Sequence, residues 1–289
     1  MNPRVLMIFV DGFGIGPADP AVNPFAGGPA PALERWLAES CVPMEVTMGV
    51  PGLPQSATGQ TALLTGVNAA AAVGGHVQGF PGPDLRALIE AHNIYDRLQV
   101  RGYRAASANA YYLESMPERL LRRRASVTTV AAVKAFGGVR DGAAMRAGEA
   151  VFHDLTRAGL LDRGYTGGLI EPEEAARHLW SIAREHDFTL FEFFESDRAG
   201  HRGTMEDARA VARKLDRLCG ELERGLDRER DLLILTSDHG NMEDMSHRMH
   251  TGTPVPFVAI GAGSGRLLKA VRSITDVTPA ILELFFDRA

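Results

Sequence analysis

The chain has 289 residues, of which 45% are hydrophobic and 23% are charged, and its formal net charge is -5. This composition is typical of a globular protein and excludes a disordered, collagen-like or coiled-coil chain. The acidic balance argues against nucleic acid or a membrane surface as a partner. Two cysteines, Cys41 and Cys219, are too few for a disulfide framework or a cysteine-built zinc site.

No apolar run reaches the ~18–20 residues that a membrane-spanning helix needs. The first segment, MNPRVLMIFVDGFG, has an apolar stretch followed directly by an acid and glycines, without the small-residue cleavage site of an export signal. We therefore expect a cytoplasmic protein whose first apolar run is a core strand.

Short apolar runs that end in polar or glycine-bearing turns predict buried strands. The expected strands are residues 5–10, 105–108, 188–194, 232–236 and 255–260. Helical patterns separate them, at residues 31–39, 85–100, 172–186, 205–224 and 270–286. This alternation predicts an α/β fold, a three-layer sandwich in which helices cover both faces of a mostly parallel central sheet.

The stretch 111–168 has poor periodicity and is rich in Ala, Arg and Gly. We interpret residues 1–289 as one domain, with 111–168 as a possible small inserted cap. The stretch contains a basic run of Arg122, Arg123 and Arg124. This run is suited either to gripping a substrate anion or to forming a solvated helix face, and we favour the solvated face.

Acids and histidines gather where the expected strands end. Ligands of such sheets bind beyond the carboxyl ends of the strands, so we expect these side chains to converge. They are Asp11, Asp197, His201, Asp238, His239 and, before the last strand, His250. Crowded carboxylates repel one another, and a divalent cation relieves the repulsion. Any one Asp is more simply a helix cap and any one His a surface residue, but the joint pattern favours a catalytic site for Mn or Zn.

A candidate nucleophile lies in residues 52–66, GLPQSATGQTALLTG. Ser56 stands where a short helix begins, and helix N-termini attract anions. Beside a divalent cation its hydroxyl could ionise and attack phosphorus. The simpler alternative is that Ser56 or Thr58 only caps the helix.

These motifs together resemble the alkaline phosphatase superfamily of binuclear metalloenzymes, most closely the branch of cofactor-independent phosphoglycerate mutase and phosphopentomutase. The resemblance rests on FVDGFG, SATGQ, DRAGH, SDHGN and HTGTPVPF. It implies an alkaline-phosphatase-like fold and two divalent ions. One ion would be held by Asp197, His201 and His250 and the other by Asp11, Asp238 and His239, with Ser56 as the phosphorylated nucleophile near both. Gln60 departs from the pattern, because the mutases have His there.

The resemblance also implies a small phosphorylated molecule as the substrate. Because 111–168 is much smaller than the cap of the mutases, we expect a phosphate-ester hydrolase that acts through a phosphoserine intermediate. The alternatives are a phosphomutase and a non-catalytic binding relative, although the latter predicts eroded ligands. Arg198, inside DRAGH, and Asn109, after the second strand, are the expected substrate contacts.

Overall fold

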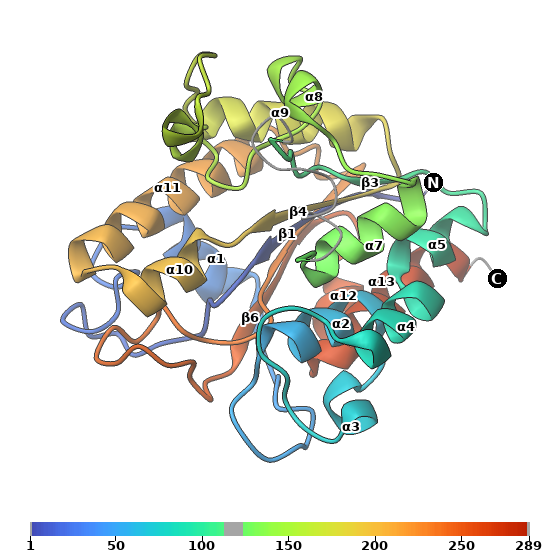
Figure 1. Ribbon diagram of the computed structural model, residues 1–289, viewed down its shortest axis with the longest axis horizontal. Helices are drawn as coiled ribbons and strands as arrows, with labels where there is room; N and C mark the ends of the chain where they lie inside the picture. The colour runs from blue at the N-terminus through green and yellow to red at the C-terminus, as the bar shows by residue number, and fades with distance from the viewer. Residues whose placement is uncertain (1, 113–123, 288–289) are drawn as a thin grey trace.

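The computed structural model describes residues 2–112 and 124–287, so part of the expected cap at 111–168, including Arg122 and Arg123, lies outside the described residues. A six-stranded sheet runs through the centre of the molecule in the order β2-β6-β5-β1-β4-β3 (Figure 1). In chain order the strands are β1 (Arg4–Val10), β2 (Cys41–Met44), β3 (Ala105–Ser107), β4 (Phe188–Phe193), β5 (Asp231–Thr236) and β6 (Val255–Gly261).

The strands β3, β4, β1 and β5 are mutually parallel, but β6 runs antiparallel to both of its neighbours, β5 and β2. The prediction of a mostly parallel sheet is therefore confirmed, with β6 as the reversed strand. No helix connects β5 to β6. Two neighbouring parallel strands need a crossover connection, which is usually a helix. Because the connection from β5 to β6 has none, β6 runs antiparallel to β5. This reversal brings the start of β6 to the edge where β1, β4 and β5 end.

Helices cover both faces of the sheet, as Figure 1 shows, and each layer packs on a hydrophobic core of its own. One core holds side chains of α2 (Ser56–Thr65), α4 (Pro83–His92), α5 (Ile94–Gln99), α7 (Val127–Phe136), α12 (Ser264–Ala270) and α13 (Val277–Phe286). The other holds side chains of α1 (Pro31–Glu39), α9 (Pro172–Arg184), α10 (Glu195–Arg202) and α11 (Met205–Arg224). The predicted three-layer sandwich is thus confirmed.

The remaining helical segments are short: α3 (Ala69–Val73), α8 (Gly142–Arg146) and the 3-10 turns η2 (Ala158–Arg163) and η3 (Ile274–Asp276). Among the described helices, none combines the length and the apolar character needed to cross a bilayer.

Two of the expected helices and one strand need correction. The pattern at 85–100 forms two helices, because Asn93 is extended and its side chain accepts a hydrogen bond from the Asp96 N–H, which starts α5 afresh. The pattern at 270–286 begins with the end of α12 and passes through η3 before α13 starts at Val277. Strand β2 was not expected, because it is a short edge strand that includes Pro43.

The central strand β1 is fixed from both sides. Val5, Met7 and Phe9 point into one core, and the alternate residues Leu6, Ile8 and Val10 point into the other. Full burial of each such side chain contributes roughly 1.5–3 kcal/mol. The backbone that leads into Asp11 is therefore among the most rigidly held parts of the molecule.

A third, smaller hydrophobic cluster lies beyond β3. It consists of Ala110, Met145, Ala150, Phe152, Leu160 and Tyr165. A parallel bridge between Asn109 and Val151 ties this cluster to the end of β3. Helix α7, from the same stretch of chain, belongs instead to a main core.

Candidate metal centre and active site

The predicted side chains meet at the edge where β1, β4 and β5 end. Asp11 follows β1 directly, Asp197 lies in the first turn of α10 after β4, and Asp238 follows β5. His250 joins them because β6 is reversed and begins at this edge. Gly12 permits the close approach of the strand ends. Its φ is +68°, and a Cβ there would lie 2.9 Å from the Cβ of Asp197.

One group of candidate ligands consists of Asp11, Asp238 and His239. The Nε2 atom of His239 lies 3.2 Å from Oδ1 of Asp11 and 3.6 Å from Oδ2 of Asp238. Both aspartates are buried, and these two oxygens have no hydrogen-bond partner in the described part of the chain. A buried carboxylate oxygen without a partner is costly, and a bound cation supplies what is missing.

A second group surrounds Asp197. Its Oδ1 atom lies 3.5 Å from Nε2 of His250 and 3.4 Å from Nε2 of His201. These two Nε2 atoms are 3.0 Å apart. The structure therefore brings together the predicted set Asp197, His201 and His250. His239 is also within reach of Asp197 and His250, and its ring stacks on His250 with centroids 3.7 Å apart.

The second nitrogen of each histidine meets a backbone carbonyl. Nδ1 of His201 is 2.8 Å from the Arg248 oxygen, Nδ1 of His250 is 2.9 Å from the Pro54 oxygen, and Nδ1 of His239 is 3.3 Å from the Gly240 oxygen. An Nδ1–H that donates to a carbonyl leaves the Nε2 lone pair free, as metal-binding histidines require. The donor set, three carboxylates and three imidazole nitrogens, suits divalent Mn or Zn.

The electrostatics of the cluster point the same way. Burial, together with the charge of Asp238, raises the pKa of Asp11 to about 7, and burial also raises the pKa of Asp238 to about 6. Burial alone would lower the pKa of His239, but Asp238 and Asp11 raise it to about 10. Burial opposes ionisation of Asp197 as well, yet His250 and His239 lower its pKa to about 2. The buried carboxylates therefore draw positive charge into the site, the role that a divalent cation fills.

Ser56 is the first residue of α2, and its hydroxyl does not cap that helix. The Oγ atom lies 2.9 Å from Nε2 of His239, within the candidate metal centre. Thr58, the rival hydroxyl, is fully buried and donates to the Gln55 carbonyl. Of the two, Ser56 is the hydroxyl that faces the acids and histidines.

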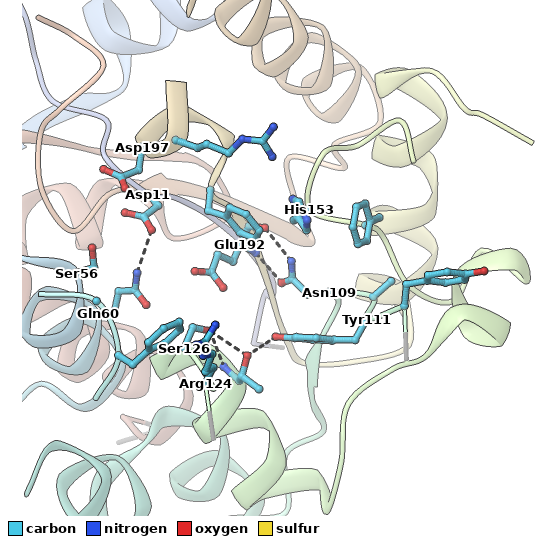
Figure 2. A pocket seen from close by; sticks show the side chains of 18 of the residues that line it. Asp11, Ser56, Gln60, Asn109, Tyr111, Arg124, Ser126, His153, Glu192 and Asp197 are labelled. Carbon is cyan, nitrogen blue, oxygen red and sulfur yellow. Dashed lines mark hydrogen bonds between the residues drawn. The ribbon is translucent and has the colours of Figure 1, made fainter. Parts of the chain in front are cut away.

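Gln60, the departure from the mutase pattern, lies one turn further along α2. Its Nε2 donates to Oδ2 of Asp11 over 3.2 Å (Figure 2). An amide can donate there at any pH, so Gln60 fixes the orientation of the Asp11 carboxylate without changing its charge.

Sequence reasoning missed Glu243, a fully buried carboxylate without a cationic partner in the described part of the chain. Its Oε2 accepts hydrogen bonds from the N–H groups of Gly14 and Asn241, at 3.0 and 2.7 Å. Its Oε1 accepts from the hydroxyls of Thr251 and Thr253. Glu243 thus joins the loops that follow β1 and β5 to the loop that carries His250. Its place five residues after Asp238 was the available signal.

A cavity of about 650 Å³ opens beside Ser56. Figure 2 shows Asp11, Ser56 and Asp197 at one end, Asn109, Tyr111 and His153 at the other, and Glu192 between them. Glu192 was also missed, although an acid inside the apolar run FTLFEFF was a signal. It accepts a hydrogen bond from the Thr128 hydroxyl, and burial raises its pKa to about 8.

The two expected substrate contacts both line this cavity. Arg198 is exposed there, next to Asp197 in α10. The side chain of Asn109 pairs with the backbone of Glu192 in both directions, each bond 2.8 Å long, so it holds β4 as well as lining the cavity. Arg124 is exposed, as expected for a solvated arginine, but it lies in a turn before α7 and not on a helix face, and it also lines the cavity.

The chain is similar to known proteins in sequence and in fold. A curated phosphoglycerate mutase of the 2,3-bisphosphoglycerate-independent type, from Cereibacter sphaeroides (strain ATCC 17025 / ATH 2.4.3), is 30% identical over 120 residues, which are 39% of this chain and 24% of the relative. The same enzyme from Natronomonas pharaonis is 30% identical over 126 residues, again 39% of this chain and 25% of the relative. The match thus spans about a quarter of the length of these relatives.

Solved structures share the fold over nearly the whole chain. The PH0037 protein from Pyrococcus horikoshii has a TM-score of 0.62 at 16% identity and covers 100% of this chain and 98% of its own. Alkaline phosphatase from the Antarctic bacterium TAB5 has a TM-score of 0.56 at 12% identity, with 98% of each chain covered. Phosphoglycerate mutase from Leishmania mexicana has a TM-score of 0.52 at 13% identity and covers 100% of this chain and 96% of its own.

The family model that matches the chain is that of the Metalloenzyme superfamily, and it covers residues 3–286, from β1 to the end of α13. The chain therefore belongs to the Metalloenzyme superfamily.

Proposed function

We propose that this protein is a metal-dependent phosphoryl-transfer enzyme that hydrolyses a small phosphate ester through a phosphoserine intermediate at Ser56. The observation that carries the proposal is the hydroxyl of Ser56, 2.9 Å from His239, at the junction of two candidate ligand groups. Asp197, His201 and His250 would hold one divalent ion, Mn or Zn, and Asp11, Asp238 and His239 would hold the other. Bound ions would supply charge stabilisation for the attacking oxygen and for the phosphoryl oxygens.

The chain's own residues perform the remaining steps. Helix α2 presents Ser56 at its positive end, toward which a phosphate is drawn. The Ser56 hydroxyl loses its proton and its oxygen attacks phosphorus, the bond from phosphorus to the leaving oxygen breaks, and the leaving alkoxide takes up a proton to become the alcohol. Water then attacks the phosphoserine, which releases inorganic phosphate and restores the hydroxyl. Arg198, exposed in the cavity beside Asp197, would contact the phosphoryl group.

The small size of the segment 111–168 favours hydrolysis over transfer of the phosphoryl group back to the substrate, because a small cap leaves the site open to water. We propose that 111–168 acts as a small cap within one catalytic domain, and the cavity beside Ser56 is lined in part by exposed arginines. Water that reaches a phosphoserine within the site can attack its phosphorus in place of an acceptor hydroxyl of the substrate. The matches to phosphoglycerate mutases support a mutase as the second candidate. Dependence on metal and on Ser56 is common to both candidates.

The test is phosphate release from phenyl phosphate by protein loaded with Mn or Zn. We expect turnover by the wild type and a loss of at least about a thousandfold in Ser56→Ala, since covalent catalysis disappears with the nucleophile. Ser246→Ala, which removes an exposed hydroxyl, is the matched control. Intact-mass measurement after rapid quenching should show one added phosphoryl group in the wild type and none in Ser56→Ala.

Full turnover by Ser56→Ala would refute the phosphoserine intermediate. Assays of phosphate-transfer products distinguish the two candidates, because a mutase moves the phosphate within the substrate and releases little of it. A metal-loaded wild type that neither hydrolyses nor transfers phosphate from a broad ester panel would refute the proposed enzyme class.

A further inference from the structure

Aromatic side chains from four separate segments line the cavity beside Ser56. Phe80 comes from the loop before α4, Phe194 from the residue before α10, and the others from the chain between β3 and α9. Those others are Tyr111, Tyr112, Phe152 and His153. Ligand cavities are lined mainly by such apolar and aromatic surface, with a few polar groups that orient the ligand.

Three of these rings form a stack, made of Phe152, His153 and Phe194. The His153 ring lies on Phe194, with centroids 3.8 Å apart and planes 27° apart, and its centroid is 4.0 Å from that of Phe152. Phe152 is buried, whereas Phe194 is only half-buried, so Phe194 is the more accessible end of the ring stack. The geometry therefore leaves an aromatic surface open to the cavity.

The ring stack carries no charge of its own. Burial, aided by the charges of Arg163 and Arg198, lowers the pKa of His153 to about 3, so its imidazole is neutral near pH 7. The arginines of the lining are compatible with a bound ring, because a planar guanidinium also stacks on aromatic faces.

Phe80 adds apolar surface that the protein itself leaves uncovered. Its side chain is 54% exposed, and among the described residues it is the one large exposed apolar side chain that lines this cavity. A phenyl ring that stays in contact with water inside a ligand cavity gains free energy when a ligand covers it.

The position of the rings matches the path of the leaving group. In an in-line displacement the leaving oxygen lies on the side of phosphorus opposite the attacking Ser56. Figure 2 shows the cavity running from Ser56 past Glu192 to Tyr111 and His153. Phe194 lies three residues before Asp197, at the start of the same helix, so the ring stack begins next to the candidate metal centre.

We propose that the leaving group of the substrate contains an uncharged flat ring, and that Phe80 and the ring stack bind this ring. Stacked or edge-on aromatic contacts favour a flat ring over an aliphatic group of equal size. This inference rests on the proposed function, since it assigns the leaving-group end of the same cavity. It makes Phe80 and Phe194 residues that determine specificity.

The experiment measures binding of three phosphonates to metal-loaded protein by calorimetry. Benzylphosphonate is phenyl phosphate with a CH2 group in place of the ester oxygen, so it is not hydrolysed. Cyclohexylmethylphosphonate keeps the size of the ring but not its flatness, and methylphosphonate has no ring. We expect the wild type to bind benzylphosphonate at least about tenfold more tightly than methylphosphonate, and at least about threefold more tightly than cyclohexylmethylphosphonate.

Two variants test the residues. Phe80→Ala should lower the preference for benzylphosphonate over methylphosphonate by about fivefold to tenfold, because apolar contact is lost. Phe194→Leu keeps an apolar side chain but removes the flat surface, so it should abolish the preference for benzylphosphonate over cyclohexylmethylphosphonate. Each ratio compares two ligands on one protein, so a change in metal affinity cancels.

Leu169→Ala is the matched control, because Leu169 is also 54% exposed but lies outside the cavity lining. It should leave both ratios unchanged. Equal binding of the three phosphonates by the wild type would overturn the inference, and so would ratios that stay the same in Phe80→Ala and Phe194→Leu. Binding of cyclohexylmethylphosphonate as tight as that of benzylphosphonate would show that the site does not select a flat ring.

The phosphonates also separate this inference from the proposed function, since their binding requires no turnover. If the wild type releases no phosphate from any ester but prefers benzylphosphonate through Phe80 and Phe194, the catalytic proposal fails and the ring site stands. If phenyl phosphate is hydrolysed through Ser56 but the three phosphonates bind alike, the ring site fails and the catalytic proposal stands.

Discussion

The two ends of the cavity are built differently. At the ligand end, side chains from the ends of β1, β4 and β5 and from the start of β6 lie within a few ångströms of one another, and most of them are buried. At the far end, Asn109, Tyr111 and His153 come from the chain between β3 and α9, which has its own small hydrophobic cluster. The comparison contrasts a tightly packed cluster of acids and histidines on a rigid sheet edge with a cavity lining supplied by a separate segment.

The largest expected effect comes from breaking the ligand end at Asp238. Asp238→Asn replaces a buried carboxylate oxygen that has no hydrogen-bond partner among the described residues. We expect the metal content to fall by about one ion per chain, and phosphate release to fall by about a thousandfold. Elemental analysis and phosphate assays measure the two effects. The exposed Asp84→Asn serves as control, and a fully loaded, active Asp238→Asn would contradict the metal assignment.

Glu243→Gln tests whether the loops of the ligand end are held as a unit. Both carboxylate oxygens of Glu243 accept hydrogen bonds, one from backbone N–H groups and the other from threonine hydroxyls. The glutamine amide keeps one oxygen but replaces the other with an NH2 group, which cannot accept these hydrogen bonds. We expect a loss of about 2–3 kcal/mol in the free energy of unfolding and metal affinity weaker by about tenfold to a hundredfold. Thermal unfolding and metal titration measure these, with the exposed Glu90→Gln as control. Unchanged metal affinity would show that Glu243 serves stability alone.

His153 sharpens the contrast, since its buried imidazole adds no charge at the far end. The pKa of His153 is about 3 in the folded protein and about 6.5 in the unfolded chain. Between these two pH values the unfolded chain binds a proton at His153 and the folded protein does not, so protonation favours unfolding. The free energy of unfolding should therefore fall by about 2 kcal/mol between pH 7 and pH 5 from this residue. His153→Phe keeps a flat ring there and should reduce the slope by that amount. The free energy of unfolding is measured by denaturant titration at pH 7 and at pH 5. An equal fall in the two proteins between these pH values would contradict a buried neutral imidazole.

The smallest effect is expected away from both ends. Arg217 on α11 contacts Glu171 and Glu173, each at 2.7 Å, on the surface formed with α9. Arg217→Gln should change the free energy of unfolding by less than about 1 kcal/mol, because exposed ion pairs are screened by solvent, and should leave metal content and phosphate release unchanged. An effect on metal content would show that the ligand end depends on distant surface contacts.

The sequence revealed most of the ligand end, because acids that follow apolar runs form a recognisable pattern. Asp11, Asp238 and His239 lie together at the predicted edge, with Asp11 3.2 Å from His239. The reversal of β6 was not visible, because direction depends on how the connection crosses the sheet and not on local pattern. Glu192 and Glu243 were not predicted, because each is held by hydrogen bonds to residues distant in the chain. Thr128 donates to Glu192, and the Gly14 N–H donates to Glu243.

The far end was the least predictable part. Its residues come from a stretch without clear periodicity, and Arg124 and Arg163 become neighbours of one cavity only through tertiary packing. Helix breaks such as Asn93 depend on a single side-chain cap, which a periodic pattern does not reveal.

The reversed strand β6 also has a consequence for how the protein matures. β6 (Val255–Gly261) lies between β5 and β2 in the sheet, so the edge strand β2 (Cys41–Met44) pairs with a strand that is made only after all the other strands described here. His250 comes just before that partner. A growing chain on the ribosome thus lacks one of its candidate ligands until the segment between β5 and β6 has been translated, and the complete ligand set forms only after β1, β4 and β5 have been made.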